Sequence, residues 1–150
     1  MKPFVFKLQT SLDVKLKREE LQKEELARAT KIYRENTDVL KSMRHRLIDI
    51  QEILRGKQHK QIDVLDILNY QDYIPALIER IKQQETVTEE SRQAMEDERQ
   101  KLVEIMRERK VLEKLRAKHY HEYVQECLRE EQKEIDEMAT MGFIHKDPAV

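Results

Sequence analysis

The sequence predicts an all-α protein in which two long helices form an antiparallel two-stranded coiled-coil hairpin. Charged and hydrophobic residues each make up 39% of the 150 residues, and aromatic residues make up 5%. That balance is too polar for a compact core but suits helices with a narrow apolar stripe and wide solvated faces. Two glycines and three prolines are also too few for many strands and tight turns. We therefore expect one domain spanning residues 1–150.

The first helix is expected over about residues 4–55. Its strongest signal is a run of positions at alternating spacings of three and four, which is the heptad pattern of a coiled-coil seam, the line of side chains that faces a partner helix. These positions are Leu26, Ala29, Tyr33, Asn36, Leu40, Met43, Leu47, Ile50 and Leu54. Towards the N-terminus the same frame meets the polar residues Gln22, Glu19 and Lys15, whereas Phe4, Leu8, Leu12 and Leu16 recur at intervals of four. We expect the seam to change phase around residues 16–26.

A turn is expected at about residues 56–62. The surrounding sequence RGKQHKQID, residues 55–63, combines a glycine with polar residues and has no apolar periodicity. Either Asp63 or Asp66 could cap the helix that follows.

The second helix is expected over about residues 63–139, with Gly142 as its end signal and a short tail over residues 140–150. Pro75 allows either a fresh start near Asp72 or a kink in a continuous helix. A capping-box pattern at residues 86–89 lies inside the running heptad, so we expect no break there. The seam has a polar middle and comprises Tyr70, Ile74, Leu77, Ile81, Gln84, Thr88, Ser91, Met95, Glu98, Leu102, Ile105, Arg109 and Leu112.

Charge supports a chain that folds back on itself. Residues 1–60 hold 15 basic and 9 acidic residues, a net charge of +6, whereas residues 61–150 hold 14 and 21, a net charge of −7. The two halves attract each other, and the same split disfavours parallel pairing of two copies. We expect a monomer. If Leu54 lies level with Ile74, Phe4 reaches only Val124, and the second helix extends well past the first.

Several functional classes are disfavoured by the residues. The chain has no phosphate-binding loop motif, its histidines lack metal-ligand spacing, and a coiled coil offers no dry pocket in which to tune carboxylates. Cys127 is the single cysteine, and its acidic neighbours disfavour a reactive thiolate. We expect no enzyme activity, metal, cofactor or small-molecule substrate. Without a signal peptide, an apolar span or paired cysteines, a cytoplasmic location is expected.

Three segments are candidates for binding a partner. Residues 13–18 and 107–118, here called the basic collar, are either solvated surface or a contact for an acidic protein or nucleic acid; nucleic acid is the weaker choice because interleaved aromatic residues are absent. Residues 65–77 place Tyr70, Tyr73 and Leu77 beside the turn, where they either dock a partner or pack locally. The third segment is the far end of the second helix, where Leu128, Ile135 and Met138 have no facing helix.

Several short motifs follow one another along nearly the whole chain. They are Phe4-Val5-Phe6-Lys7-Leu8-Gln9, Leu12-Asp13, Glu19-Glu20, Glu25-Leu26-Ala27, Asn69-Tyr70-Gln71-Asp72-Tyr73-Ile74, Leu77, Ile81, Arg109-Lys110, Leu112-Glu113-Lys114-Leu115 and residues 131–139, EQKEIDEMA. Each motif alone is common in coiled coils, but through their order, their spacing and its length the chain resembles the bacterial flagellar FliJ family.

That resemblance implies a non-enzymatic component of the flagellar type III export apparatus, folded like the central shaft of rotary ATPases. It implies a stalk that enters the export ATPase ring with the end bearing both termini, promotes ring assembly and activity, and contacts the export gate membrane protein and export chaperones from the inner face of the cell membrane. The implied gate contacts are Tyr70, Tyr73 and Leu77. The implied ring contacts are Arg109, Lys110, Lys114, Gln132, Lys133, Asp136 and Glu137.

Two other functions stay open at this point. One is a generic coiled-coil tether or dimerising spacer, in which the basic collar is only solvated surface. The other is a nucleic-acid-binding helical hairpin that uses residues 107–118.

Overall fold

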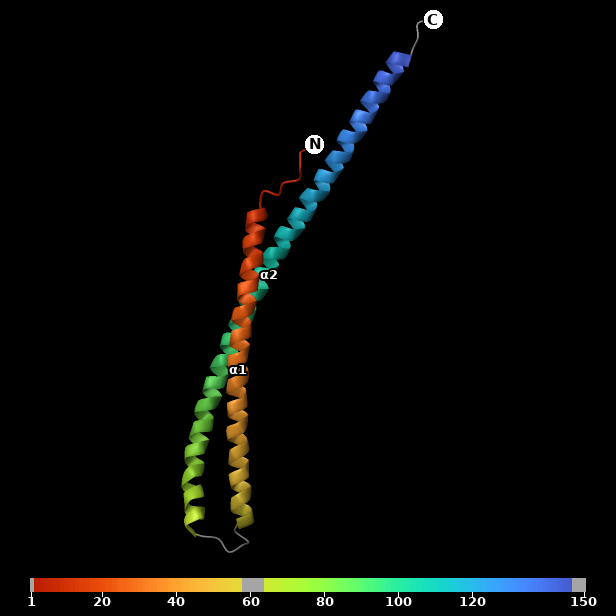
Figure 1. Ribbon diagram of the computed structural model, residues 1–150. Helices are drawn as coiled ribbons and strands as arrows, with labels where there is room; N and C mark the ends of the chain where they lie inside the picture. The colour runs from red at the N-terminus through yellow and green to blue at the C-terminus, as the bar shows by residue number, and fades with distance from the viewer. Residues whose placement is uncertain (1, 58–63, 147–150) are drawn as a thin grey trace. The chain divides into compact units, whose positions relative to one another are not determined.

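The computed structural model describes residues 2–57 and 64–146 and contains two helices, α1 (Gln9–Lys57) and α2 (Val64–Lys146), with no strand in those ranges. The predicted all-α hairpin is confirmed (Figure 1). The chain divides into two compact units: unit 1 comprises Met1–Arg18 with Ile105–Val150, and unit 2 comprises Glu19–Glu104. None of the described helical residues forms a segment long and apolar enough to span a membrane.

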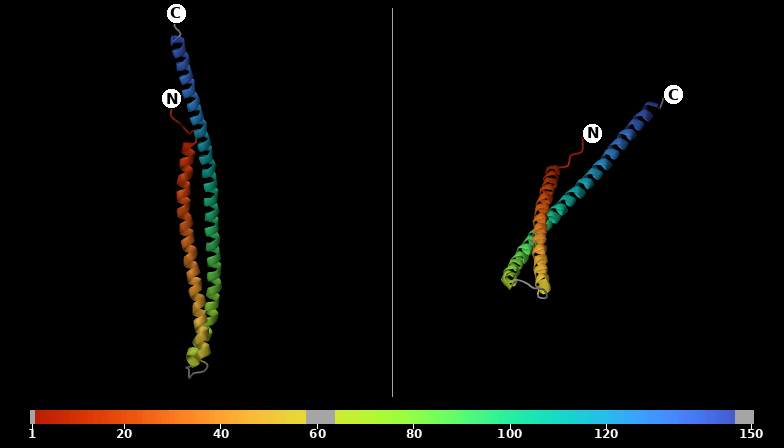
Figure 2. Two further views of the ribbon diagram at one scale, coloured as in Figure 1. Left: turned by 90° about the vertical axis from the view of Figure 1, so that its right-hand side faces the viewer. Right: turned by 60° about the horizontal axis from the view of Figure 1, so that its bottom comes forward.

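Unit 2 has its apolar core next to the turn. Leu40 and Ile50 of α1 are buried against Leu77 and Ile81 of α2, and both views of Figure 2 show these stretches of helix side by side. The predicted α1 positions from Leu26 to Leu54 are all buried or half-buried, which confirms that part of the seam. Partly buried residues extend the cluster: Met43, Leu47, Leu54, Tyr70, Tyr73 and Ile74.

The middle of the unit 2 seam is polar, as predicted. The side chains of Gln84 and Thr88 both donate hydrogen bonds to the Asn36 carbonyl, at 3.1 and 3.3 Å. Further along, the Gln22 amide donates to the Glu98 carbonyl at 3.0 Å and also to the Glu98 carboxylate. Because these polar groups form hydrogen bonds between the two helices, the helices stay paired here without an apolar layer.

The predicted change of seam phase is wrong. Leu8 and Leu16 are 39% and 40% exposed, whereas Glu19 is 5% exposed and Gln22 is half-buried. The heptad frame read back from Leu26 therefore runs on through polar residues. The physical reason is the partner helix, which presents Glu98 to Gln22 and so accepts a polar side chain there.

Helix α1 begins at Gln9, not near residue 4, and residues 2–6 are not helical. Exposure alternates along this segment: Phe6 is 6% exposed, Val5 is 76% exposed and Phe4 is half-buried. That period of two is typical of a non-helical chain that turns every second side chain towards its support. Packing of both phenylalanines against α2 thus overrides helix formation.

The remaining helix ends also differ from expectation. Helix α1 includes Gly56 and ends at Lys57, while the rest of the predicted turn and Asp63 lie outside the described residues. Helix α2 has Asp66 in its first turn and includes Pro75 without ending, so the continuous-helix alternative holds. It also passes Gly142, where a methyl group in place of the hydrogen would meet nothing within 4 Å and where φ is not positive. A glycine inside a helix costs only about 1 kcal/mol relative to alanine, so Gly142 does not have to end the helix.

Candidate protein-binding surfaces

The basic collar lies in unit 1, and several of its cations are held by neighbouring side chains. Lys15 of α1 forms an ion pair with Glu108 of α2. The Arg109 side chain is only 17% exposed and pairs with Glu113 at 2.9 Å, in keeping with its seam position. These cations stabilise unit 1 and are poorly placed to meet a partner.

Other cations of the collar face solvent. Lys110, Lys114 and Lys118 are exposed on α2, and none of them forms an ion pair among the residues that the structure describes. Lys17 and Arg18 add exposed charge from α1. Of the predicted ring contacts, Lys110 and Lys114 are thus free to meet an acidic surface, whereas Arg109 is largely committed to the seam.

The other predicted ring contacts lie on the exposed far part of α2. Gln132 donates a hydrogen bond to the Asp136 carboxylate at 2.9 Å, one turn along the same helix, and Lys133 and Glu137 are exposed. At a rise of about 1.5 Å per residue, Gln132 is roughly 27 Å along the helix from Lys114. The predicted contacts therefore form two separate patches on unit 1.

Beyond the N-terminal segment, α2 within unit 1 is bare, as its apolar pattern predicted. Leu128, Ile135 and Met138 are 53%, 58% and 70% exposed. No side chain from 128 to 141 is buried or half-buried. This part of α2 offers its whole circumference to a partner.

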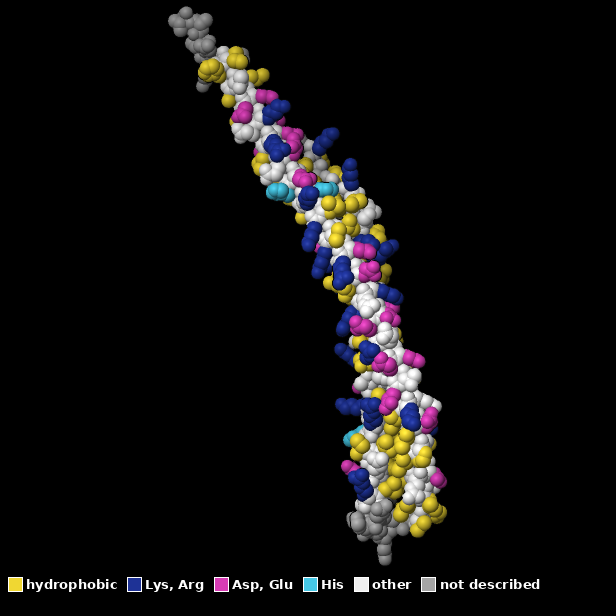
Figure 3. All heavy atoms as spheres, turned by 180° about the vertical axis from the view of Figure 1, so that it is seen from behind, with side chains coloured by type: hydrophobic (Ala, Val, Ile, Leu, Met, Phe, Trp, Pro, Cys, Tyr) yellow, Lys and Arg dark blue, Asp and Glu magenta, His cyan; other side chains and the backbone are white. Residues whose placement is uncertain are grey.

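The surface beside the turn, in unit 2, is only partly as predicted. Tyr70 and Tyr73 are half-buried, and the Arg46 guanidinium lies over the Tyr73 ring, 5.3 Å from its centroid. Of the two alternatives left open for Leu77, local packing holds: it is 2% exposed and packs in the core cluster, as its seam position predicts. Figure 3 shows hydrophobic side chains gathered between the two helices in this region.

Exposed apolar side chains beside the turn come from positions off the heptad. Leu65 and Leu68 are 66% and 50% exposed. An open hollow of about 450 Å³ lies between the helices here, lined by Ile53, Asn69 and Tyr73 among others. Sequence reasoning singled out residues 65–77 but chose the seam residue Leu77 over these flanking leucines.

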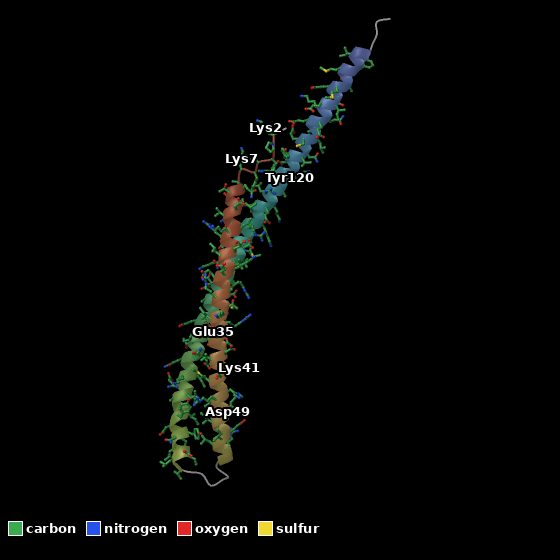
Figure 4. All side chains as sticks on the ribbon, viewed as in Figure 1. Lys2, Lys7, Glu35, Lys41, Asp49 and Tyr120 are labelled. Carbon is green, nitrogen blue, oxygen red and sulfur yellow. The ribbon has the colours of Figure 1, made fainter. Side chains whose placement is uncertain are left out.

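A further site in unit 1 was missed from the sequence. Residues 2–6 pack along α2, where the Phe4 ring meets Tyr120 edge-on at 5.2 Å and Tyr123 at 5.5 Å. The Phe6 ring meets His119 at 5.8 Å. Figure 4 labels Lys2 and Tyr120 where this segment meets the helix. The signal in the sequence was the Phe-x-Phe spacing of two, which does not suit a helix face.

Within residues 2–57 and 64–146, no three His, Cys, Asp or Glu side chains come close enough together to hold a metal ion. The exposed charges, the bare helix and the aromatic contacts are features that suit binding of other proteins.

An antiparallel helical hairpin with a polar-centred seam defines a coiled-coil protein. The family described as flagellar FliJ protein matches residues 4–147, and the chain therefore belongs to the FliJ family. It is a component related to flagellar protein export. No curated protein and no solved structure matches the chain.

Proposed function

We propose that this chain is a non-enzymatic stalk of the flagellar type III export apparatus. It binds the export ATPase ring through unit 1, promotes ring assembly and activity, and links the ring to the export gate membrane protein and to export chaperones. It works as a monomer and a single functional domain in the cytoplasm, at the inner face of the membrane. The observation that carries the proposal is the set of exposed, unpaired lysines of the collar, together with the bare end of α2, in a chain of the FliJ family.

Exposed lysines suit ring binding because the free charge meets an acidic surface without first breaking an internal ion pair. Charge complementarity of this kind raises association rates and fixes orientation more than it adds affinity. The bare α2 end supplies apolar side chains for the closer contact, through Leu128, Ile135 and Met138. The basic collar and the bare end of α2 together provide the charged and the apolar contacts that a protein interface needs.

The surface beside the turn supports the proposed gate contact. Tyr73 offers a half-buried ring, and Leu65 and Leu68 offer exposed apolar area. Leu77 supports this surface from within, because it belongs to the core cluster against which Tyr73 packs. Aromatic residues at the centre of an interface often dominate its binding energy.

The test reverses the exposed lysines and leaves Arg109 intact. We expect Lys110→Glu, Lys114→Glu and Lys118→Glu together to reduce stimulation of the purified export ATPase at least about tenfold, because like charges across an interface cost several kcal/mol. Helicity by circular dichroism should not change. A matched control is Lys31→Glu, Lys41→Glu and Lys82→Glu, which makes the same charge change at exposed lysines of unit 2.

Equal stimulation by the collar variant and the wild-type chain would contradict the ring contact. Loss of salt-dependent DNA binding with ATPase stimulation intact would instead favour the nucleic-acid alternative. A dimeric mass in solution would favour the dimerising spacer.

Gate binding is tested separately by Leu68→Ser with Tyr73→Ala. We expect weaker binding to the cytoplasmic part of the gate protein and unchanged ATPase stimulation. Equal loss of both activities would refute the division of labour between the two units.

A further inference from the structure

The contact between residues 2–6 and α2 has the chemistry of a peptide-recognition site. Four side chains of α2 meet the segment: Arg116, His119, Tyr120 and Tyr123, here called the 116–123 stripe. They lie at helical spacings of three and four, so they share one face of α2. The contact is confined to unit 1.

Each member of the stripe makes a contact with the segment. Tyr120 presents its ring edge-on to Phe4, and the Arg116 guanidinium lies over the Phe4 ring, 5.7 Å from its centroid. His119 meets the Phe6 ring. The Tyr123 hydroxyl donates a hydrogen bond to the Lys2 carbonyl at 2.7 Å, which fixes the position of the backbone. The stripe therefore recognises two aromatic side chains two residues apart.

Tyr123 is suited to donate that hydrogen bond over a wide pH range. Burial raises the pKa of its hydroxyl above the ordinary value of 10.0, and the neighbouring Cys127 acts in the same direction. The hydroxyl thus keeps its proton throughout the physiological range.

Acidic side chains border the site next to Lys2. An open hollow of about 740 Å³ between the segment and α2 is lined by Glu122 and Glu126 from the helix and by Lys2, Pro3 and Val5 from the segment. Both glutamates are exposed. Lys2, two positions before Phe4, lines the same hollow as Glu122 and Glu126, so a basic residue at this position suits the acidic border.

The resident segment is held by a small number of contacts, and Phe6 is the one buried side chain among residues 2–6. It makes no helix of its own, Phe4 is only half-buried and Val5 is 76% exposed. Each aromatic contact and the single neutral hydrogen bond stabilise the segment only modestly. A short segment held by a few such contacts exchanges readily with a competitor of the same chemistry.

We propose that the 116–123 stripe is a docking site for an extended segment of a partner protein with the pattern basic-x-aromatic-x-aromatic, and that residues 2–6 occupy it in the absence of that partner. The chain's own KPFVF sequence shows which chemistry the stripe accepts. Partner binding displaces this segment from α2 while α1 and α2 keep their pairing.

The experiment uses a synthetic peptide of residues 2–8, capped at both ends, as the probe. The receptor is the full chain carrying Phe4→Ser and Phe6→Ser, which empties the stripe without touching it. We expect saturable shifts of the His119, Tyr120 and Tyr123 signals by nuclear magnetic resonance as the peptide is added. In the wild-type chain the tethered segment competes at an effective concentration in the millimolar range, so the apparent peptide affinity should be at least about fivefold weaker.

Two matched changes separate recognition from nonspecific binding. A peptide with serine in place of both phenylalanines should not bind. Adding Tyr123→Phe to the receptor should weaken peptide binding about fivefold, the effect of one hydrogen bond, while circular dichroism shows unchanged helicity.

Absence of saturable binding to the emptied receptor, or shifts that map away from the stripe, would overturn the proposal. A wild-type chain that sediments as a dimer while the Phe4→Ser, Phe6→Ser chain sediments as a monomer would also overturn it, since a second copy would then be the occupant. No ATPase or gate protein enters these measurements, so their outcome is independent of the proposed stalk function.

Discussion

Unit 2 and unit 1 are built from the same two helices but are stabilised in different ways. In unit 2 both helices contribute buried side chains, and Leu77 and Ile81 reach 2% and 7% exposure. In unit 1 a short non-helical segment replaces helix pairing at the end of α1, and α2 is bare beyond it. Unit 2 therefore holds most of the buried apolar side chains, whereas unit 1 leaves more of its surface exposed.

The same contrast recurs within unit 2. Beside the turn the seam is apolar, whereas in its middle the side chains of Gln84 and Thr88 donate hydrogen bonds to the Asn36 carbonyl. Polar seam positions lower stability but fix the register and number of helices. The apolar cluster thus provides stability, and the polar middle specifies which residues face each other.

Truncating the core of unit 2 should change stability most. Leu77→Ala should lower the free energy of unfolding by about 2–5 kcal/mol, because it leaves a cavity among buried side chains. Leu128→Ala in unit 1, where the side chain is 53% exposed, should change it by less than about 0.5 kcal/mol. Urea unfolding followed by circular dichroism measures both, and similar losses would erase the contrast between the units.

A more modest change is expected from making the polar middle apolar. Gln84→Leu with Thr88→Val should raise the free energy of unfolding by about 1 kcal/mol, because buried polar groups are replaced by apolar ones. We also expect the loss of a single defined register, visible as self-association in sedimentation. If the double variant is less stable and strictly monomeric, the polar layer contributes stability instead of specificity.

The weakest effect is expected from pH. The hydrogen bond from Gln22 lowers the pKa of Glu98 below its ordinary value of 4.5, although partial desolvation opposes this. A lowered pKa in the folded state means that the stabilisation is present above about pH 4.5 and is lost as the pH falls through the lowered value. Gln22→Met should flatten this part of the pH dependence of stability, measured by urea unfolding at a series of pH values. An unchanged pH profile would show that the hydrogen bond from Gln22 to Glu98 does not contribute to the pH dependence of stability.

Much of the fold was predictable because the heptad pattern is a local signal. The positions from Leu26 to Leu54 are buried or half-buried, as the spacing alone predicted. Burial of Glu19 was not predictable in the same way, since it depends on a facing helix that accepts polar groups. Tertiary contact also overrode helical periodicity at Phe4 and Phe6, whose packing against α2 delays the start of α1.

The candidate surfaces were predictable as segments but less so as side chains. Lys110 and Lys114 are exposed, as the basic segment 107–118 suggests. Arg109 belongs to the same segment, yet its side chain is largely buried. For Leu77 the sequence left partner docking and local packing open, because apolar residues crowd residues 65–77, and only the pairing of the helices shows which of them face inward. Family membership itself was predictable, because it depends on the order and spacing of many weak motifs.

The bare part of α2 has a consequence for the thermodynamics of binding. From Leu128 to Met141 every side chain is exposed, so the helix receives no tertiary support there, and isolated helices of about this length are marginal in water. Its amides therefore exchange with solvent through local fraying, without global unfolding. Any partner that covers this stretch also fixes its conformation, so association loses entropy at the bare end and shows a more negative heat-capacity change than the contact area alone would give.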